Sequence, residues 1–195
     1  MALSVDELRK TVANLKLEGL NSQQIADELS LSQDTVAWLS SSGAESEEAP
    51  EDIRIGWRTI GVRPVRTEAM ATVFADVLQE EMGDEGVHTI VGISLNGILF
   101  AHEIAKLLDI EVSIHRNVDG GSGHGSLSNK YGQVSGKRVA IVDDVLSSGT
   151  TMRSTISMMR QMGAEVVLCM VLVNKTTLNE IEGVPLRGMI RAVPF

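Results

Sequence analysis

The stretch VAIVDDVLSSGTT, residues 139–151, decides the fold of this chain. Its apolar start predicts a buried β-strand, Asp143 and Asp144 stand at the carboxyl end of that strand, and a turn of Ser, Gly and Thr leads into a helix. Backbone N–H groups at such a turn bind anions, and the hydroxyls add donors for a phosphate. The paired carboxylates can accept hydrogen bonds from vicinal hydroxyls of a sugar. The predicted phosphate-binding residues are Ser147, Ser148, Gly149, Thr150 and Thr151.

The surrounding sequence alternates between strand-like and helix-like segments. The predicted strands are 54–62, 87–94, 110–115, 137–144, 165–173 and 187–193, and the predicted helices are 67–82, 96–108 and 150–162. Thr67 is expected to cap the first of these helices. This alternation predicts an α/β fold with a parallel sheet that helices cover on both faces. Ligands on such sheets bind outside the carboxyl ends of the strands.

Two further segments are expected at that edge of the sheet. GISLNG, residues 92–97, follows an apolar strand and opens a helix. A polar, glycine-rich stretch covers residues 116–136.

Residues 139–151 resemble the phosphoribosyl pyrophosphate (PRPP) signature of type I phosphoribosyltransferases. The segment 92–97 is similar to the pyrophosphate loop of that family, whose backbone amides face a diphosphate, and 116–136 is similar to its mobile loop, which closes over the reacting centre. The resemblance implies that the ligand contacts from these segments are made by Ser94, Leu95, Asn96, Gly97, Arg116 and His124. Together these resemblances cover residues 53–195. They imply a type I phosphoribosyltransferase-like parallel sheet that binds PRPP, with Mg²⁺ carried by PRPP rather than held directly by the protein.

The mobile loop departs from the pattern of the orotate branch of the family. Orotate phosphoribosyltransferases carry several lysines there, whereas this chain reads HRNVDGGSGHG over residues 115–125. Stabilising charge on the leaving pyrophosphate is a large catalytic term, so the missing cations should cost several kcal/mol of transition-state stabilisation. Binding survives that loss better than turnover. The sequence therefore leaves transferase activity undecided, and the missing lysines favour a protein without that activity.

An acidic linker precedes this domain. Residues 41–52, SSGAESEEAPED, contain five carboxylates and neither an aromatic nor a β-branched residue, so they predict a flexible connection. The linker separates a helical module at 1–40 from the larger domain at 53–195. The formal net charge of −9 argues against a nucleic-acid partner, but residues 53–195 are nearly neutral, with fourteen basic and fifteen acidic groups.

The first 40 residues predict three short helices around a small all-α core. Residues 22–36 are similar to the helix-turn-helix of many transcription factors, with Ala26 at the helix contact, Leu31 in the turn and Ser32 as the cap of the second helix. The second helix contains neither Arg nor Lys, so weak, salt-sensitive DNA contact is expected. The side chains predicted to face the major groove are Gln33, Asp34, Thr35, Ala37 and Trp38.

The whole arrangement resembles archaeal orotate phosphoribosyltransferase-like transcriptional regulators, which are linked to control of sugar catabolism. That resemblance implies a homodimer that binds promoter DNA and senses PRPP or a related phosphorylated ribose. One alternative is an active orotate phosphoribosyltransferase with an added arm. Another is a module 1–40 that serves only for assembly. Deletion of 1–52 that abolishes dimerisation and leaves DNA binding unchanged would favour that second alternative.

Three remaining features limit the class of protein. An apolar run of 18 residues and a signal peptide are both absent from the sequence, so a soluble, cytoplasmic protein is expected. Cys169 is the single cysteine and lies in an apolar run, which predicts a buried thiol rather than a disulfide. The arginines beyond the linker fit DNA contact and subunit or ligand contact equally well, and these are Arg54, Arg58, Arg63 and Arg66.

Overall fold

The computed structural model describes residues 4–41, 50–116 and 126–193. Its internal contacts divide the chain into a helical unit, Met1–Gly56 with Ala192–Phe195, and a sheet-containing unit, Trp57–Arg191. The predicted ligand residue His124 lies outside the described residues. No helix in the described part of the chain is long and apolar enough to cross a membrane.

The helical unit consists of α1 (Val5–Leu17), α2 (Ser22–Leu29) and α3 (Gln33–Ser40). Each helix begins at a capping side chain that accepts a hydrogen bond from the backbone of the first turn. The three caps are Ser4, Asn21 and Ser32. The helices bury a small apolar core, which comprises Val12, Ile25, Ala26, Leu29, Leu31, Val36 and Leu39. The three predicted helices and the roles of Ala26, Leu31 and Ser32 are thereby confirmed.

Within the described residues, the second unit contains a seven-stranded sheet in the order β3-β2-β1-β4-β5-β7-β6. The strands are β1 (Thr89–Ile93), β2 (Glu111–Arg116), β3 (Ser126–Leu127), β4 (Arg138–Leu146), β5 (Glu165–Asn174), β6 (Glu180–Ile181) and β7 (Val184–Arg191). The central strands pair in parallel, while the two-residue strands β3 and β6 pair antiparallel at the edges. The predicted parallel α/β sheet is confirmed, and the short edge strands are additions to it.

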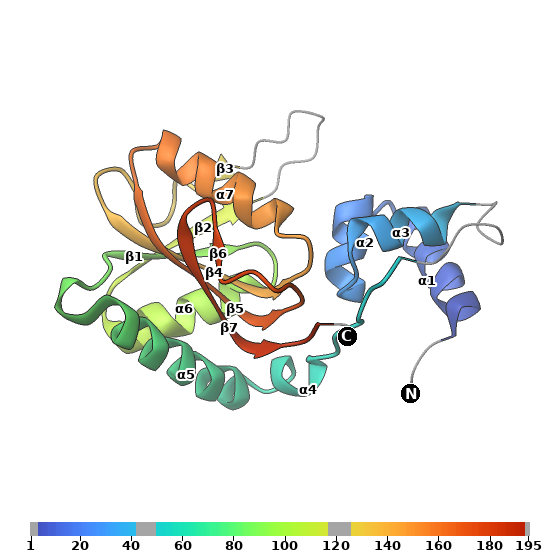
Figure 1. Ribbon diagram of the computed structural model, residues 1–195, viewed down its shortest axis with the longest axis horizontal. Helices are drawn as coiled ribbons and strands as arrows, with labels where there is room; N and C mark the ends of the chain where they lie inside the picture. The colour runs from blue at the N-terminus through green and yellow to red at the C-terminus, as the bar shows by residue number, and fades with distance from the viewer. Residues whose placement is uncertain (1–3, 42–49, 117–125, 194–195) are drawn as a thin grey trace. The chain divides into compact units, whose positions relative to one another are not determined.

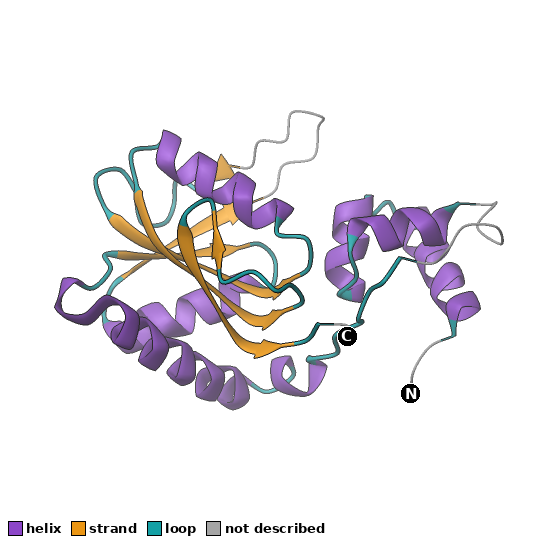
Figure 2. Ribbon diagram, in the orientation of Figure 1, coloured by secondary structure: helices purple, strands orange, loops and turns teal. Residues whose placement is uncertain are grey.

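Helices lie on both faces of this sheet (Figure 1, Figure 2). The helices of this unit are α4 (Arg58–Gly61), α5 (Pro64–Met82), α6 (Gly97–Leu108) and α7 (Thr150–Gln161), and a 3₁₀ turn, η1, covers Gly83–Glu85. α7 covers one face, and α6 packs on β1 and β4 from the other face with α5 packed against α6. Burial on both faces explains why β1 and β5 are almost continuously apolar.

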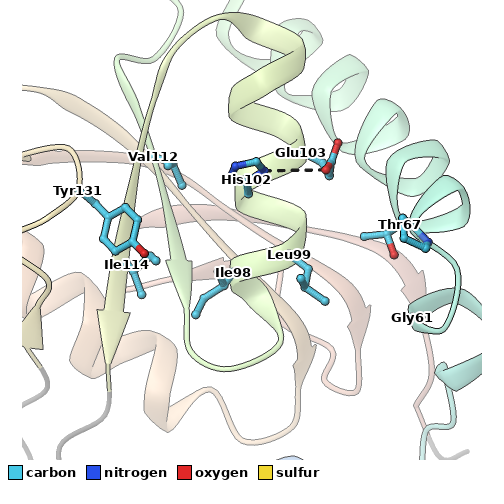
Figure 3. A pocket seen from close by; sticks show the side chains of 10 residues that line it. Gly61, Thr67, Ile98, Leu99, His102, Glu103, Val112, Ile114 and Tyr131 are labelled. Atoms are coloured by element: carbon cyan, nitrogen blue, oxygen red, sulfur yellow. Dashed lines mark ion pairs between the residues drawn. The ribbon is translucent and has the colours of Figure 1, made fainter.

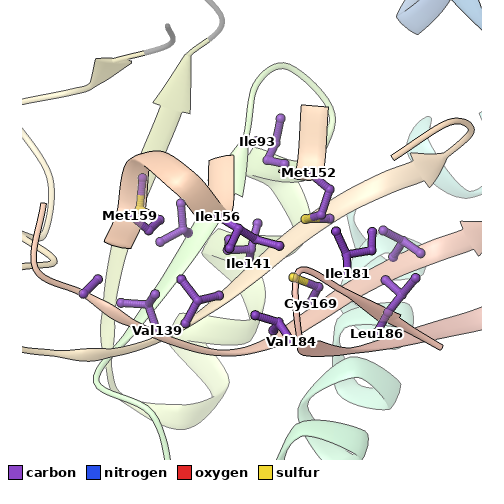
Figure 4. Close-up of a cluster of buried hydrophobic side chains, with 14 of the residues drawn as sticks. Ile93, Val139, Ile141, Met152, Ile156, Met159, Cys169, Ile181, Val184 and Leu186 are labelled. Atoms are coloured by element: carbon purple, nitrogen blue, oxygen red, sulfur yellow. The ribbon is translucent and has the colours of Figure 1, made fainter. Parts of the chain in front are cut away.

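The core beneath α7 is made by side chains of consecutive parallel strands (Figure 4). Met152, Ile156 and Met159 of α7 pack on Ile141 and Cys169 among other strand residues. Cys169 is fully buried, and burial raises the pKa of its thiol to about 12. The prediction of a buried, unpaired cysteine is confirmed.

Two predicted elements were wrong at the start of this unit. Residues 54–62 do not form a strand, because the segment up to Trp57 has no regular secondary structure and Arg58–Gly61 forms α4. α5 begins at Pro64 rather than at a Thr67 cap, since proline fits the first turn of a helix and the preceding Arg63 is extended. Thr67 is instead buried within the helix.

Candidate functional site

The two predicted phosphate loops lie at the point where the strand order reverses. β1 is flanked by β2 on one side and by β4 on the other, so the loops that follow β1 and β4 open from adjacent strands. This is the position at which open parallel sheets bind ligands, because the flanking connections leave in opposite directions there. The structure therefore brings together 94–97 and 143–151, as the sequence predicts.

Asp144 connects these loops. Its side chain is only 7% exposed, and its Oδ2 accepts hydrogen bonds from Asn96 Nδ2 at 3.0 Å and from Trp57 Nε1 at 2.7 Å. Asp143 is less buried, and its Oδ1 accepts a hydrogen bond from the backbone N–H of Asp144 at 2.9 Å. The two carboxylates thus have different surroundings, and Asp144 is held by donors from two other segments.

Gly97 permits the close approach of these loops. A Cβ atom built at Gly97 would lie 3.0 Å from the Asp143 Cα and 3.2 Å from its Oδ1, with the carbonyl oxygen of Val142 nearer still. Any larger residue must therefore displace backbone. Ser94 is half-buried, and Leu95 is 75% exposed between it and Asn96. The loop after β1 consequently offers backbone and exposed surface at the edge of the sheet.

The loop after β4 has the conformation of an anion-binding turn. Gly149 adopts φ +78° at the start of α7, in the left-handed region that favours glycine. Ser148 Oγ lies 3.0 Å from Thr150 Oγ1, and both side chains are exposed. Ser147 and Thr151 are half-buried beside them. The backbone N–H groups of the first turn of α7 and several hydroxyls therefore gather at one place.

The end of β2 supplies one exposed cation and one buried base. Arg116 is exposed and pairs with Ser126 of β3 at the same edge of the sheet. His115 is 1% exposed, and its Nδ1 lies 3.2 Å from Thr155 Oγ1, while its Nε2 has no hydrogen-bond partner among the described residues. Burial lowers the pKa of His115 to about 4, so the ring is neutral at pH 7.

The predicted groove-facing residues of α3 fall into two groups. Gln33, Asp34 and Ala37 are exposed, and the Gln33 amide donates to Gln23 of α2. Thr35 does not project outward as expected, since it is only 8% exposed. Trp38 is half-buried, and the guanidinium of Arg9 lies 4.8 Å from the centroid of its ring.

Asp52 explains the position of Thr35. Its Oδ2 accepts hydrogen bonds from the Ser32 backbone N–H at 2.7 Å and from Thr35 Oγ1 at 2.8 Å, so a carboxylate from the predicted linker stabilises the first turn of α3. The contacts of Asp52 and Trp57 were not predicted from the sequence. A tryptophan five residues after the end of the acidic linker was a local signal for the contact of Trp57.

A separate cavity of about 320 Å³ lies beside α6 and β2 (Figure 3). Its lining residues are Gly61, Pro64, Thr67, Ile98, Leu99, His102, Glu103, Val112, Ile114 and Tyr131. None of these belongs to the predicted phosphate loops. The sheet-edge site, which is formed by residues 94–97 and 143–151, is therefore distinct from this mainly apolar cavity.

Comparison with known proteins defines the class. Residues 60–181 match the family model described as phosphoribosyl transferase domain. The solved orotate phosphoribosyltransferase from Aeropyrum pernix is 24% identical, with a TM-score of 0.57 over 75% of this chain and 82% of that one. An adenine phosphoribosyltransferase from Saccharomyces cerevisiae is 18% identical, with a TM-score of 0.59 over 74% and 89%. The sheet-containing unit thus has the type I phosphoribosyltransferase fold.

Similarity to curated relatives covers nearly the whole chain. Transcriptional regulator GfcR from Thermoplasma acidophilum is 40% identical over 190 residues, which is 96% of each chain. The protein of the same name from Haloferax volcanii is 34% identical over 205 residues and 97% of each chain. The chain belongs to this family of archaeal transcriptional regulators, in which it carries the phosphoribosyl transferase domain described above.

Proposed function

We propose that the protein is a DNA-binding transcriptional regulator that senses PRPP, or a related phosphorylated ribose, without converting it. Two findings together carry the proposal. The chain has a sheet-edge site containing 94–97 and 143–151, and it is 40% identical to a curated transcriptional regulator over 96% of its length. Sugar or nucleotide metabolism is the expected field of control, since such a ligand reports on both.

The chemistry of the site supports a ribose phosphate. The turn at 147–151, in which Ser148 and Thr150 are exposed, offers backbone N–H groups and hydroxyls to a monoester phosphate, and the loop at 94–97 offers backbone to a diphosphate. Asp143 and Asp144 stand between them as acceptors for ribose hydroxyls. The exposed Arg116 adds a cation at the end of β2.

Mg²⁺ fits this site only as part of the ligand. Within residues 4–41, 50–116 and 126–193, no three or more His, Cys, Asp and Glu side chains gather into a metal site. Phosphate and hydroxyl oxygens of PRPP are the hard donors that Mg²⁺ prefers. The ion would therefore enter with PRPP and neutralise its charge, with Asp143 and Asp144 close to the complex.

The helical unit supplies the proposed DNA contact. α2 and α3 meet at a tight turn, with Ser30 in the left-handed region and Leu31 buried. This supports a helix-turn-helix in which exposed Gln33, Asp34 and Ala37, together with the edge of Trp38, face the major groove. Because α3 lacks cations, two copies in one dimer would be needed for useful affinity.

Exposed apolar side chains beside the α6 cavity support a homodimer. Leu99 is 51% exposed and Tyr131 is 46% exposed, and both line the cavity. Leu99→Glu is expected to convert a dimer into a monomer in light-scattering measurements at micromolar concentration. Leu17→Glu is the matched control, because Leu17 is 87% exposed on the helical unit. A dimer that survives Leu99→Glu would exclude this face.

Calorimetric titration with PRPP and Mg²⁺ tests the ligand site. The double substitution of Asp143→Asn with Asp144→Asn is expected to weaken PRPP binding at least tenfold, about 1.4 kcal/mol, because two charged acceptors are lost. The double substitution of Asp76→Asn with Asp84→Asn makes the same charge change at exposed positions and serves as the control. Unchanged PRPP affinity in the first variant, with native circular dichroism, would contradict the site assignment.

A turnover assay tests the alternative that the chain is an active orotate phosphoribosyltransferase. Its support is the fold shared with orotate phosphoribosyltransferases. Incubation with orotate, PRPP and Mg²⁺ is expected to give no orotidine monophosphate above background, while calorimetry detects PRPP binding. Steady product formation would instead favour an orotate phosphoribosyltransferase with a regulatory arm.

A further inference from the structure

Trp57 contacts Asp144, the carboxylate proposed to bind ribose, from within the same unit. Its indole N–H donates to Asp144 Oδ2 at 2.7 Å, although the two residues are 87 positions apart. The indole ring packs on Phe100 with centroids 5.6 Å apart, and Phe100 packs on Phe74 at 5.5 Å. A Cβ atom at Gly61 would lie 2.7 Å from the indole, so the short helix α4 also fits closely against it. The contact is therefore built by several elements.

This contact competes with the ligand that the proposed function requires. Asp144 Oδ2 already accepts two hydrogen bonds, from Trp57 and Asn96, and a carboxylate oxygen accepts about two. A ribose hydroxyl that binds the same oxygen must displace one of these donors. Asn96 belongs to a loop that would itself close on the ligand, whereas Trp57 belongs to neither phosphate loop. Breaking the Trp57 hydrogen bond to Asp144 therefore costs ligand binding less than breaking the Asn96 hydrogen bond.

Trp57 is also the point where the chain enters the sheet-containing unit. It is the first residue of that unit, and the segment before it leads to the helical unit. Asp52, five residues earlier, is bound to the first turn of α3. The chain between the two units therefore has one anchor on the helix proposed to read DNA and another on the carboxylate proposed to bind ribose.

We propose that Trp57 is a latch that the ribose hydroxyls of the effector displace from Asp144. The inference rests on the proposed function and gives that function a route from the ligand site to the helical unit. Displacement of the indole removes the anchor nearest the linker and lengthens the free chain next to Asp52. The ligand thereby changes how tightly the helical unit is tethered, because it binds the released state better than the latched one.

Fluorescence of Trp57 tests the latch in the full chain. Trp38 and Trp57 are the two tryptophans of the sequence, so Trp38→Phe leaves Trp57 as the single reporter. PRPP with Mg²⁺ is expected to shift its emission to longer wavelength and to increase acrylamide quenching about twofold. Asp144→Ala in the same background should give the released signal before any ligand is added.

Calorimetry on the same samples distinguishes a failure of the proposed function from a failure of the latch. Absence of PRPP binding contradicts the proposed function, and the latch falls with it. PRPP binding with unchanged Trp57 emission and quenching contradicts the latch alone. An Asp144→Ala variant whose Trp57 signal matches the parent would also overturn it, because the indole would then not depend on that carboxylate.

Trp57→Phe provides an independent test. Phenylalanine keeps an aromatic ring against Phe100 and removes the donor that competes for Asp144, so PRPP is expected to bind about fivefold more tightly. Trp38→Phe should leave PRPP affinity unchanged and is the matched control. Weaker PRPP binding by Trp57→Phe would overturn the latch, since it would make Trp57 a support for the ligand instead of its competitor.

Discussion

The sheet-edge site and the surface of α3 differ in how far their polar side chains are engaged inside the protein. At the sheet edge, Ser148 and Thr150 remain exposed and contact each other, and Asp144 is bound by donors from distant segments. On α3, Thr35 is buried under Asp52 and Trp38 is partly covered by Arg9. A phosphate can therefore reach Ser148 and Thr150 directly, whereas a ribose hydroxyl must displace a donor from Asp144. The surface of α3 must likewise give up internal contacts before all its predicted residues can bind DNA.

The largest expected effect comes from the packing that the sheet-edge site requires. Gly97→Ala should lower the free energy of unfolding of this unit by about 3 kcal/mol, because the added Cβ meets the backbone of Val142 and Asp143. Urea unfolding followed by Trp57 fluorescence in the Trp38→Phe background measures this. Gly56→Ala is the control, since a Cβ there meets nothing within 4 Å. Equal stability of the two variants would refute the close approach of the loops.

The second effect is a pH dependence of stability in the sheet-containing unit, which contains His115. The pKa of His115 is about 4 in the folded state, below its ordinary value of 6.5, so the unfolded chain takes up a proton first on acidification. Its contribution to stability is complete above pH 6.5 and is lost as the pH falls to about 4, by about 3 kcal/mol. His115→Leu should remove this part of the pH dependence in urea titrations.

The exposed His102 gives the control for that measurement. Its side chain is 67% exposed, so His102→Gln should keep the full slope between pH 6.5 and 4. A His115→Leu variant with the parent slope would show that His115 is hydrated in solution. The helical unit contains no histidine, so its Trp38 signal should lack this step in either case.

The smallest effect concerns the carboxylate on α3. Asp52→Ala removes the acceptor for the Ser32 N–H and Thr35 Oγ1, and it should destabilise the helical unit by about 1 kcal/mol. Thermal unfolding followed by Trp38 in the Trp57→Phe background measures this loss. Glu51→Ala removes a neighbouring exposed carboxylate and should have little effect. Equal melting temperatures would mean that Asp52 does not hold α3.

Local patterns in the sequence predicted the central strands, most helices and the positions of the loops after β1 and β4. Burial on both faces makes the strands apolar runs, and Ser4, Ser32 and Gly149 mark helix starts that depend on nearby backbone. The predicted strand at 54–62 was wrong because the structure of this segment depends on residues that are distant in sequence. Its apolar residues are typical of a strand, but Trp57 is fixed by Asp144 and Phe100, which are distant in sequence.

The same limit applies to single residues of the candidate sites. Helical spacing places Thr35 on the outer face of α3, and only the return of Asp52 explains its burial. His115 was predicted simply as part of a strand, and its neutral, buried ring depends on packing under α7. Contacts between distant segments decide which predicted residues stay available, and a local pattern does not encode them.

The central claim is that this chain binds DNA in a manner controlled by a ribose phosphate. Selection of bound fragments from genomic DNA of the source organism, at moderate salt with and without PRPP and Mg²⁺, tests it most directly. The account predicts enrichment of discrete promoter fragments whose yield changes when PRPP is present. Absence of enrichment in both conditions would contradict it and would leave the helical unit as an assembly element.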